Sequence, residues 1–294
     1  MITRPMLAAA ANAEDLRKLR YPLLASPKLD GIRLLCHPKL GPVTRSFKPL
    51  PNEYLRELLA HDLYKGLDGE LMMVDENGKP ANFNQIQSAV MSQAGQPQIQ
   101  YWVFDYFLSP SDPFTERTYD LIHIVEKDTK GIVRVLTHVQ VNSPEEVVSL
   151  ASEWIQEGFE GLILRDPSGV YKSGRSTLKQ QGMIKYKEFA DAEGIIVGFE
   201  ELYHNQNPQE RSVLGLAERS DKKEGLVPAN TLGALVLSTQ WGELRVGSGF
   251  DLSLRDAIWR DRDKYLGKVV TFKYQTHGMQ DLPRFPIFLR FRED

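Results

Sequence analysis

The sequence predicts an α+β domain followed by a smaller, mostly β domain. Two segments, 52–60 and 144–157, have apolar residues at helical spacing, and strand-like runs surround both. After Phe189 the pattern changes to short strands with one helical stretch near 253–264. A series of short strands is typical of a small barrel. We therefore place a domain boundary near 189–190.

The first domain, residues 1–189, is expected to alternate strands with helices. Its helix at 144–157 has the clearest limits, because Ser143 can cap the start, Glu146 can complete a capping box and Gly158 suits the end. Its strands are expected at 31–36, 68–74, 101–107, 132–139, 160–165 and 182–187. Many of these runs are bounded by Gly, Pro or Asp, which favour turns.

The second domain, residues 190–294, is expected to contain four main strands. They are placed at 194–200, 232–238, 243–248 and 268–274. Roughly thirty mostly polar and charged residues separate the first two strands. A loop of that length is either functional or disordered.

Composition excludes several classes of protein. With 294 residues and 41% hydrophobic content, the chain can fill one large or two ordinary cores. No apolar run is as long as a membrane span and the amino terminus lacks a secretory signal, so we expect a cytoplasmic protein without a membrane partner. The single cysteine, Cys36, excludes an intrachain disulfide, and the six scattered histidines leave carboxylates as the metal ligands. A net charge of −3 gives no overall signal for nucleic acid.

The segment from Lys28 to Arg33 suits a nucleophilic lysine. A lysine amine is protonated near neutral pH, so attack on phosphorus requires burial or nearby cations to lower its pKa. Arg33 is a candidate neighbour, and Asp30-Gly31 can form the turn that presents the amine. A surface loop could also contain Lys28, Asp30, Gly31 and Arg33. This segment alone is therefore weak evidence for a nucleophilic lysine.

Two lysines and two carboxylates strengthen the signal. Lys185 and Lys187 are two residues apart on a predicted strand and therefore share a face, which favours a nearby anion or a solvated edge strand. Glu70 and Glu160 each lie beside an apolar strand, where they are either surface residues or ligands of a hard cation. Together with Lys28 they form a set suited to phosphoryl transfer.

In this order the segments resemble the motifs of the covalent nucleotidyltransferases, and within them the ATP-dependent DNA ligases of the minimal viral and phage type. The matching segments of the first domain are Lys28–Arg33, Thr44–Phe47, Asp68–Glu70, Tyr101–Tyr106, Glu160–Gly161 and Lys185–Lys187. Those of the second domain are Leu232–Leu235, Val246–Phe250 and Pro283–Pro286. The resemblance implies a nucleotidyltransferase domain with an ATP-grasp-like ligase fold, then an OB-fold domain with a latch-like insert at 203–229. Together with the preceding Glu200 and Glu201, the acidic residues of this insert outnumber its four Lys and Arg residues, so its grip on phosphate would rest on few side chains and main-chain amides.

The resemblance also implies an activity: sealing of nicks between a 3′-hydroxyl and a 5′-phosphate in duplex DNA, through a lysyl-AMP and an adenylated DNA intermediate. Lys28 would attack the α-phosphate of ATP, which Lys185 and Lys187 would bind. Glu160 and Glu70 would hold Mg²⁺, for which Mn²⁺ would substitute, or Glu70 would bind the ribose instead.

Further residues would contact the nucleotide or the nick by the same resemblance. Phe104 would stack on adenine, and Ser26 would bind the adenine amino group. Arg33 and Arg45 would contact the ribose or the 5′-phosphate, and Arg284 would approach pyrophosphate. The partner would be nicked double-stranded DNA, and we expect a monomer because a clamp must open and close around the duplex.

Two other classes of function remain open. An RNA ligase or an mRNA capping enzyme shares the Lys-x-Asp-Gly segment, although Pro283–Pro286 and the second domain favour a DNA ligase. A non-catalytic nucleic-acid-binding module is the other alternative. The presence of Lys28, Glu160, Lys185 and Lys187 argues against it.

Overall fold

The computed structural model describes residues 2–73, 81–211, 217–220, 222–276, 279 and 281–292. It divides into two compact units, residues 1–187 and 188–294. Within the described part of the chain, no helix is long and apolar enough to cross a membrane.

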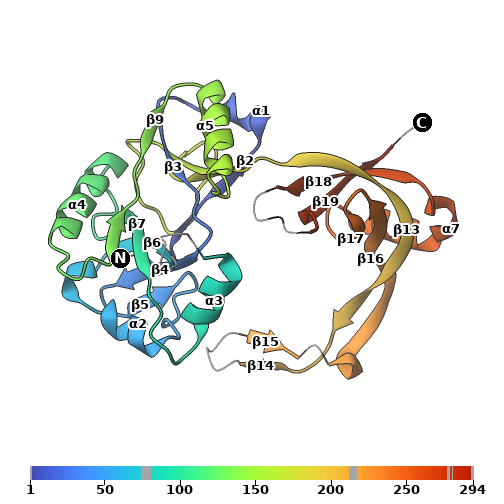
Figure 1. Cartoon of the computed structure of the whole chain (residues 1–294), viewed down its shortest axis with the longest axis horizontal. Helices are drawn as coiled ribbons and strands as arrows, with labels where there is room; N and C mark the ends of the chain where they lie inside the picture. The colour runs from blue at the N-terminus through green and yellow to red at the C-terminus, as the bar shows by residue number, and fades with distance from the viewer. Residues whose placement is uncertain are drawn as a thin grey trace. The chain divides into compact units, whose positions relative to one another are not determined.

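Two five-stranded sheets form the framework of the first unit (Figure 1). One has the order β2-β12-β10-β3-β9, from Ala9–Ala11, Ile184–Tyr186, Leu162–Arg165, Leu23–Pro27 and Val139–Val141. The other has the order β5-β4-β6-β7-β8, from Gly41–Thr44, Ile32–His37, Leu67–Met72, Gln100–Tyr106 and Val133–Val135. A short parallel pair joins β1 (Met6–Leu7) to β11 (Gly174–Arg175).

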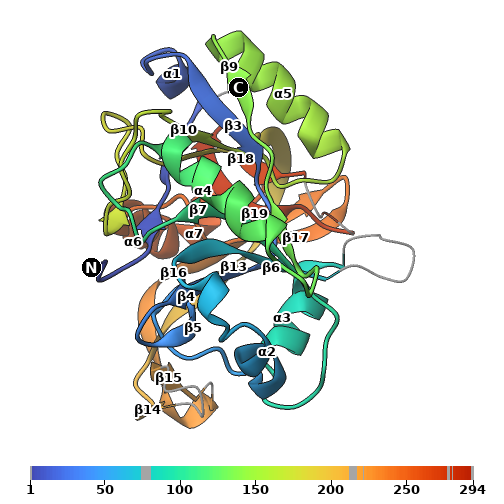
Figure 2. The same cartoon turned by 90° about the vertical axis from the view of Figure 1, so that its left-hand side faces the viewer.

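Helices cover the outer faces of these sheets (Figure 2). They are α1 (Ala13–Leu16), α2 (Glu53–Leu58), α3 (Phe83–Met91), α4 (Phe114–Glu126) and α5 (Pro144–Gln156), with a 3₁₀ turn, η1, at Asp62–Tyr64. The apolar face of α5 buries Val147, Ala151 and Trp154 in one core with Leu23 and Leu162 of the first sheet. This packing holds β3 and β10, the strands of the first sheet that contain Leu23 and Leu162, against α5.

Local signals in the sequence were sufficient to place the start and end of α5. The Ser143 hydroxyl accepts a hydrogen bond from the Glu146 N–H at 3.2 Å, and Gly158 has a φ of 96° after the last turn. The expected capping box is wrong in one detail. The Glu146 carboxylate accepts from the N–H of Asn142 at 2.8 Å, not from that of Ser143.

One expected strand was wrong, and one helix was missed. The expected strand at 132–139 is two strands in different sheets, since β8 adds to β7 and β9 pairs with β3. Helix α4 was not expected at all. Its inner face contains Arg117 besides Phe114 and Leu121, and a buried charge interrupts the apolar periodicity on which the prediction depended.

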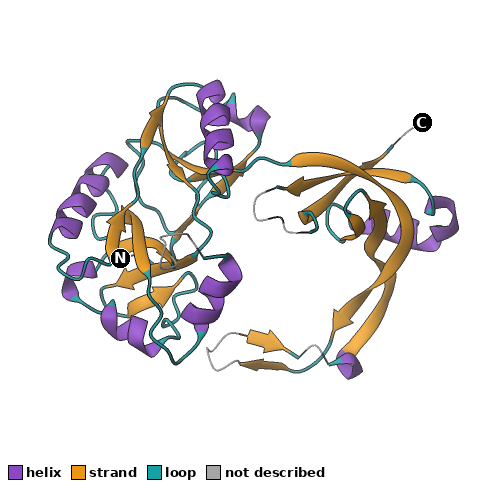
Figure 3. Cartoon of the chain, viewed as in Figure 1, coloured by secondary structure: helices purple, strands orange, loops and turns teal. Residues whose placement is uncertain are grey.

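In the second unit, strands are the main element (Figure 3). One sheet has the order β17-β16-β13-β18-β19, from Gly242–Val246, Leu226–Thr239, Ala190–Asn205, Val269–Gln275 and Arg284–Phe291. The unit also contains α6 (Leu252–Arg260), α7 (Arg262–Tyr265) and a 3₁₀ turn, η2 (Lys223–Gly225). Among its described strands the sheet is not closed by a continuous ladder. A single parallel bridge, Ser248 to Ile287, connects the segments at its two edges.

Much of the expected loop at 203–229 is strand. Strands β13 and β16 continue to pair as far as Asn205 and Leu226, as the long ribbon in Figure 1 shows. Beyond them β14 (Gln209–Arg211) pairs with β15 (Ala217–Arg219). The Asn207 amide joins the two sides, donating to the carbonyl oxygens of Ser220 at 2.6 Å and Lys222 at 2.9 Å. Positions 212–216 and 221 lie outside the described residues.

Candidate active site

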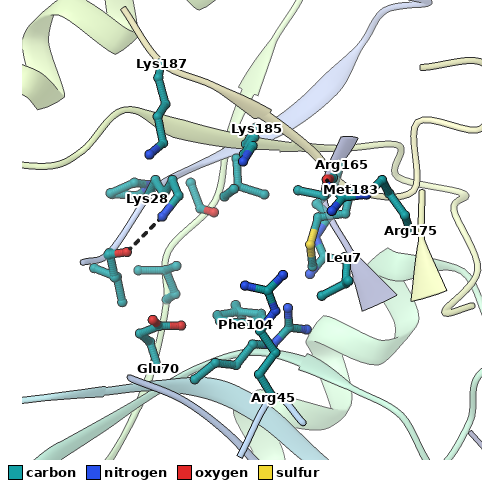
Figure 4. A pocket seen from close by; sticks show the side chains of 17 residues that line it. Leu7, Lys28, Arg45, Glu70, Phe104, Arg165, Arg175, Met183, Lys185 and Lys187 are labelled. Carbon is teal, nitrogen blue, oxygen red and sulfur yellow. Dashed lines mark hydrogen bonds between the residues drawn. The ribbon is translucent and has the colours of Figure 1, made fainter. Parts of the chain in front are cut away.

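A cavity of about 280 Å³ lies between the two sheets of the first unit, and 17 residues line it (Figure 4). The first sheet and the turns that follow its strands supply Ser26, Lys28, Ile163, Arg165, Lys185 and Lys187. The second sheet supplies Arg33, Glu70 and Phe104. The structure thus brings together, from distant parts of the sequence, most of the residues expected to bind a nucleotide.

Main-chain hydrogen bonds place Lys28 directly beside the Glu160–Gly161 segment. The Lys28 N–H donates to the Gly161 carbonyl oxygen at 2.8 Å, and the Lys28 carbonyl oxygen accepts from the Glu160 N–H at 3.2 Å. Gly161 has a φ of 139°, and a β-carbon there would clash with the Tyr186 carbonyl oxygen. A glycine at this position therefore allows the start of β10 to lie against the end of β12.

The Glu160 carboxylate forms ion pairs with both Lys28 and Lys187. One carboxylate oxygen contacts the Lys28 Nζ and the other contacts the Lys187 Nζ. Glu160 is only 8% exposed, so this pairing takes place largely out of water. Glu160 itself does not line the cavity, but it positions two ammonium groups that do.

Burial lowers the pKa of Lys28 below its ordinary value. Glu70 and Asp30 oppose this effect, while Arg45 and Arg33 add to it. A lower pKa makes the neutral amine, the nucleophilic form, easier to reach near neutral pH.

Lys185 and Lys187 both line the cavity, as expected for residues two apart on one strand (Figure 4). Burial, and then the positive charge of Lys28, lower the pKa of Lys185. Three ammonium groups gathered around one cavity favour the binding of an anion there.

Glu70 and Arg33 face each other across β6 and β4. Burial raises the pKa of Glu70 to about 7, so its carboxyl group titrates near neutral pH. Arg33 was expected to contact ribose or phosphate. That contact stays a prediction. Its Nε and Nη2 donate to the two carboxylate oxygens of Asp68 at 2.9 and 2.6 Å, and the Tyr171 hydroxyl donates to the same carboxylate at 2.7 Å.

Phe104 forms one wall of the cavity, and Ser26 and Arg45 also line it. The guanidinium groups of Arg33 and Arg165 lie 5.2 and 5.9 Å from the centre of the Phe104 ring. Ser26 is only 1% exposed and lies opposite Ile163 in the sheet. Gly31 lies close to the main chain of β6, because a β-carbon there would clash with the Leu71 carbonyl oxygen.

A buried charge network behind the cavity was not predicted from the sequence. Asp105 accepts from the Arg117 Nε at 2.7 Å and from the Arg165 Nη1 at 2.8 Å, and all three side chains are buried. One signal was present in the sequence. Asp105 shares the inward face of its strand with Tyr101 and Val103, and a carboxylate on such a face requires a buried partner.

Arg175 is a second residue that was not predicted. It lines the cavity from β11, and its Nη1 donates to the Ala8 carbonyl oxygen at 2.7 Å. In the second unit, Arg284 begins β19, with its guanidinium 5.1 Å from the centre of the Phe285 ring. The expected contact between Arg284 and pyrophosphate stays a prediction.

The two expected metal ligands are separate carboxylates. Within the described ranges, no group of three or more His, Cys, Asp or Glu residues is placed to hold a metal ion. Magnesium, however, commonly binds one or two carboxylates together with substrate phosphates and waters. Glu70, which lines the cavity, therefore fits a cation that arrives with a nucleotide phosphate. Glu160 lies outside the lining and would have to exchange a lysine for the cation.

Comparison with known proteins identifies both units. Residues 5–187 match the family described as ATP dependent DNA ligase domain, and residues 227–292 match the DNA ligase OB-like domain. A solved structure of chlorella virus DNA ligase-adenylate is 32% identical, covering 99% of this chain and 100% of that chain, with a TM-score of 0.55.

Two curated relatives are more distant. A DNA ligase of African swine fever virus is 29% identical over 136 residues, which is 45% of this chain and 31% of that protein. The chain thus spans about a third of the length of this relative. The DNA ligase of Enterobacteria phage T4 is 22% identical over 360 residues, covering 98% of this chain and 68% of that protein. Because the first family match alone covers well over half of the residues, the chain belongs to the family of ATP-dependent DNA ligase domains.

Proposed function

We propose that this protein is an ATP-dependent DNA ligase that seals nicks in duplex DNA through a covalent lysyl-AMP intermediate. One observation carries the proposal. The partly buried Lys28 amine lies in a cavity with Lys185 and Lys187, and the Glu160 carboxylate joins two of these three ammonium groups. Such a site can deliver a lysine to a phosphate whose charge is neutralised by fixed cations.

In the first step the Lys28 Nζ attacks the α-phosphorus of ATP. A nitrogen–phosphorus bond forms, the bond to the bridging oxygen breaks, and pyrophosphate leaves. Burial of Lys28 favours loss of the ammonium proton before attack. Lys185 and Lys187 bind the α-phosphate and neutralise the charge that develops on it.

A divalent cation would be held by Glu160 and Glu70 together with phosphate oxygens. Mg²⁺ would fill this role, with Mn²⁺ as a substitute. When bound it would neutralise phosphate charge, and Glu70 either binds it or contacts the ribose.

The nucleoside would lie between the two sheets of the first unit. Phe104 provides an aromatic face for adenine, Ser26 a hydroxyl for the adenine amino group, and Arg45 a cation for ribose or phosphate. Arg33, which lines the same cavity, would contact the ribose or the 5′-phosphate. Held by Asp68, it supports the Phe104 wall and adds positive charge near Lys28.

In the later steps, AMP passes to the 5′-phosphate of a nick, and the 3′-hydroxyl then displaces it. The partner is nicked double-stranded DNA, and the protein acts as a monomer. The second domain, 190–294, is an OB-fold domain whose insert at 203–229 serves as a latch on the duplex. Arg284 contacts pyrophosphate during the first step.

The test uses purified protein, ATP labelled at the α-phosphate and Mg²⁺, followed by a denaturing gel. We expect a labelled protein band that singly nicked DNA discharges while the nick is sealed. Lys28→Ala should abolish the band, whereas Lys18→Ala should not, because Lys18 is 72% exposed and does not line the cavity.

Three results would contradict the proposal. A band in the Lys28→Ala variant would place the nucleophile elsewhere. Discharge by nicked RNA alone would indicate an RNA ligase. Absence of any band, with salt-dependent binding to duplex DNA, would indicate a binding module without covalent chemistry.

A further inference from the structure

Arg165 lines the cavity although only 1% of its surface is exposed. Its Nη1 donates to the Asp105 carboxylate at 2.8 Å and to the Gly182 carbonyl oxygen at 3.3 Å. Its Nη2 is buried and donates to no group in the described part of the chain. A buried donor without an acceptor costs free energy, so an acceptor that reaches this nitrogen would be bound favourably.

The position of Arg165 relates it to the base of a nucleotide rather than to the phosphates. Lys28 and Lys187 lie at one end of the cavity, whereas Arg165 and Met183 lie at the other (Figure 4). On β10, Arg165 is two residues beyond Ile163 and so lies on the same face, about 7 Å further along the strand. A nucleotide with its α-phosphate at the lysines would extend its base toward this end.

The chemistry of this end suits a purine ring. Phe104 offers an aromatic face that lies 5.9 Å from the Arg165 guanidinium. The ring nitrogens N1, N3 and N7 of adenine accept hydrogen bonds, and an arginine can only donate them.

We propose that Arg165 is a base-recognition residue, whose Nη2 donates a hydrogen bond to a ring nitrogen of the adenine of ATP. Asp105 and Gly182 hold the guanidinium in place before the nucleotide arrives, so little ordering is needed on binding. This inference rests on the proposed function, because it takes ATP as the nucleotide of the cavity.

The test changes the nucleotide and the protein separately. Binding of ATP and of 1-deaza-, 3-deaza- and 7-deaza-ATP is measured by calorimetry without a divalent cation, so that no adduct forms. For the wild-type protein we expect one analogue to bind about 10- to 100-fold more weakly than ATP, the loss of one hydrogen bond to a charged donor. In Arg165→Lys, which keeps a cation beside Asp105 but has no second nitrogen, ATP and that analogue should bind equally.

Arg20→Lys is the matched control, because Arg20 is 63% exposed and does not line the cavity. It should keep the wild-type discrimination between ATP and the weak analogue. Circular dichroism checks that each variant folds, and Arg165→Gln, which keeps a donor toward Asp105, replaces Arg165→Lys if that variant does not.

Two results would overturn the inference: equal binding of all four nucleotides to the wild-type protein, or unchanged discrimination in the Arg165 variant. The adduct assay reports separately on the proposed function. Analogue discrimination without any adduct would leave Arg165 as a base-recognition residue while removing the ligase assignment. An adduct without discrimination would do the reverse.

Discussion

Replacement of Glu70 by glutamine should stabilise the protein at alkaline pH but much less at acidic pH. Burial raises the pKa of Glu70 from its usual 4.5 to about 7. Between these two values the folded protein keeps a proton that the unfolded chain has released, so the free energy of unfolding falls as pH rises. With about 1.36 kcal/mol for each pKa unit, the wild-type protein should lose about 2.5 kcal/mol between pH 5 and pH 8 through this one group.

The Glu70→Gln variant has no carboxyl group to ionise and should not show this loss. Urea unfolding of both proteins at pH 5 and pH 8 gives the comparison, because the titration of all other groups cancels in the difference. The variant should gain about 2.5 kcal/mol relative to wild type between the two pH values. Glu53→Gln, at a carboxylate that is 72% exposed, should show no such change. A Glu70→Gln difference that is the same at both pH values would refute the reasoning.

Three other perturbations test the site and its support. Lys187→Ala should slow adduct formation in single-turnover assays more than it weakens nick binding in gel shifts, and equal losses would contradict a role at the α-phosphate. Asp105→Asn should lower the free energy of urea unfolding by about 3–5 kcal/mol, because Arg117 and Arg165 lose their shared buried anion; a loss below about 1 kcal/mol would contradict this. Burial lowers the pKa of His138 to about 4, so the unfolded chain is protonated first as pH falls. His138→Phe should therefore gain about 2 kcal/mol relative to wild type between pH 7 and pH 4.5 in urea unfolding, and a constant difference would contradict the lowered pKa.

Local signals were sufficient for the parts of the site that lie within one segment. Strand alternation alone placed Lys185 and Lys187 on one side, and both line the cavity. Capping residues and a terminal glycine gave the limits of α5 to within a residue or two. Such features depend on neighbours in sequence, so a single sequence contains what is needed to predict them.

Features that depend on distant pairing could not be predicted. Arg33 faces the cavity as expected, but its guanidinium is held by Asp68, 35 residues away in the chain. Asp105 and Arg165 are 60 residues apart, and only the packing of the two sheets makes them partners. Strand alternation indicates that Asp105 faces inward, but the identity of its partner is a property of the tertiary fold, and Arg165 looks from sequence like an ordinary charged residue.

The pairing of β2 with β12 has a consequence for synthesis of the protein on the ribosome. Strand β2 contains residues 9–11 and lies parallel to residues 184–186 of β12, which hold Lys185 at the cavity. The first sheet therefore cannot be completed until almost the whole of the first unit has been translated. Until then β2 has no partner strand, and its unpaired edge is exposed to other chains. Because the contact between β2 and β12 is non-local, it also slows folding. Chaperone binding to nascent chains should accordingly persist until β12 has left the ribosomal tunnel.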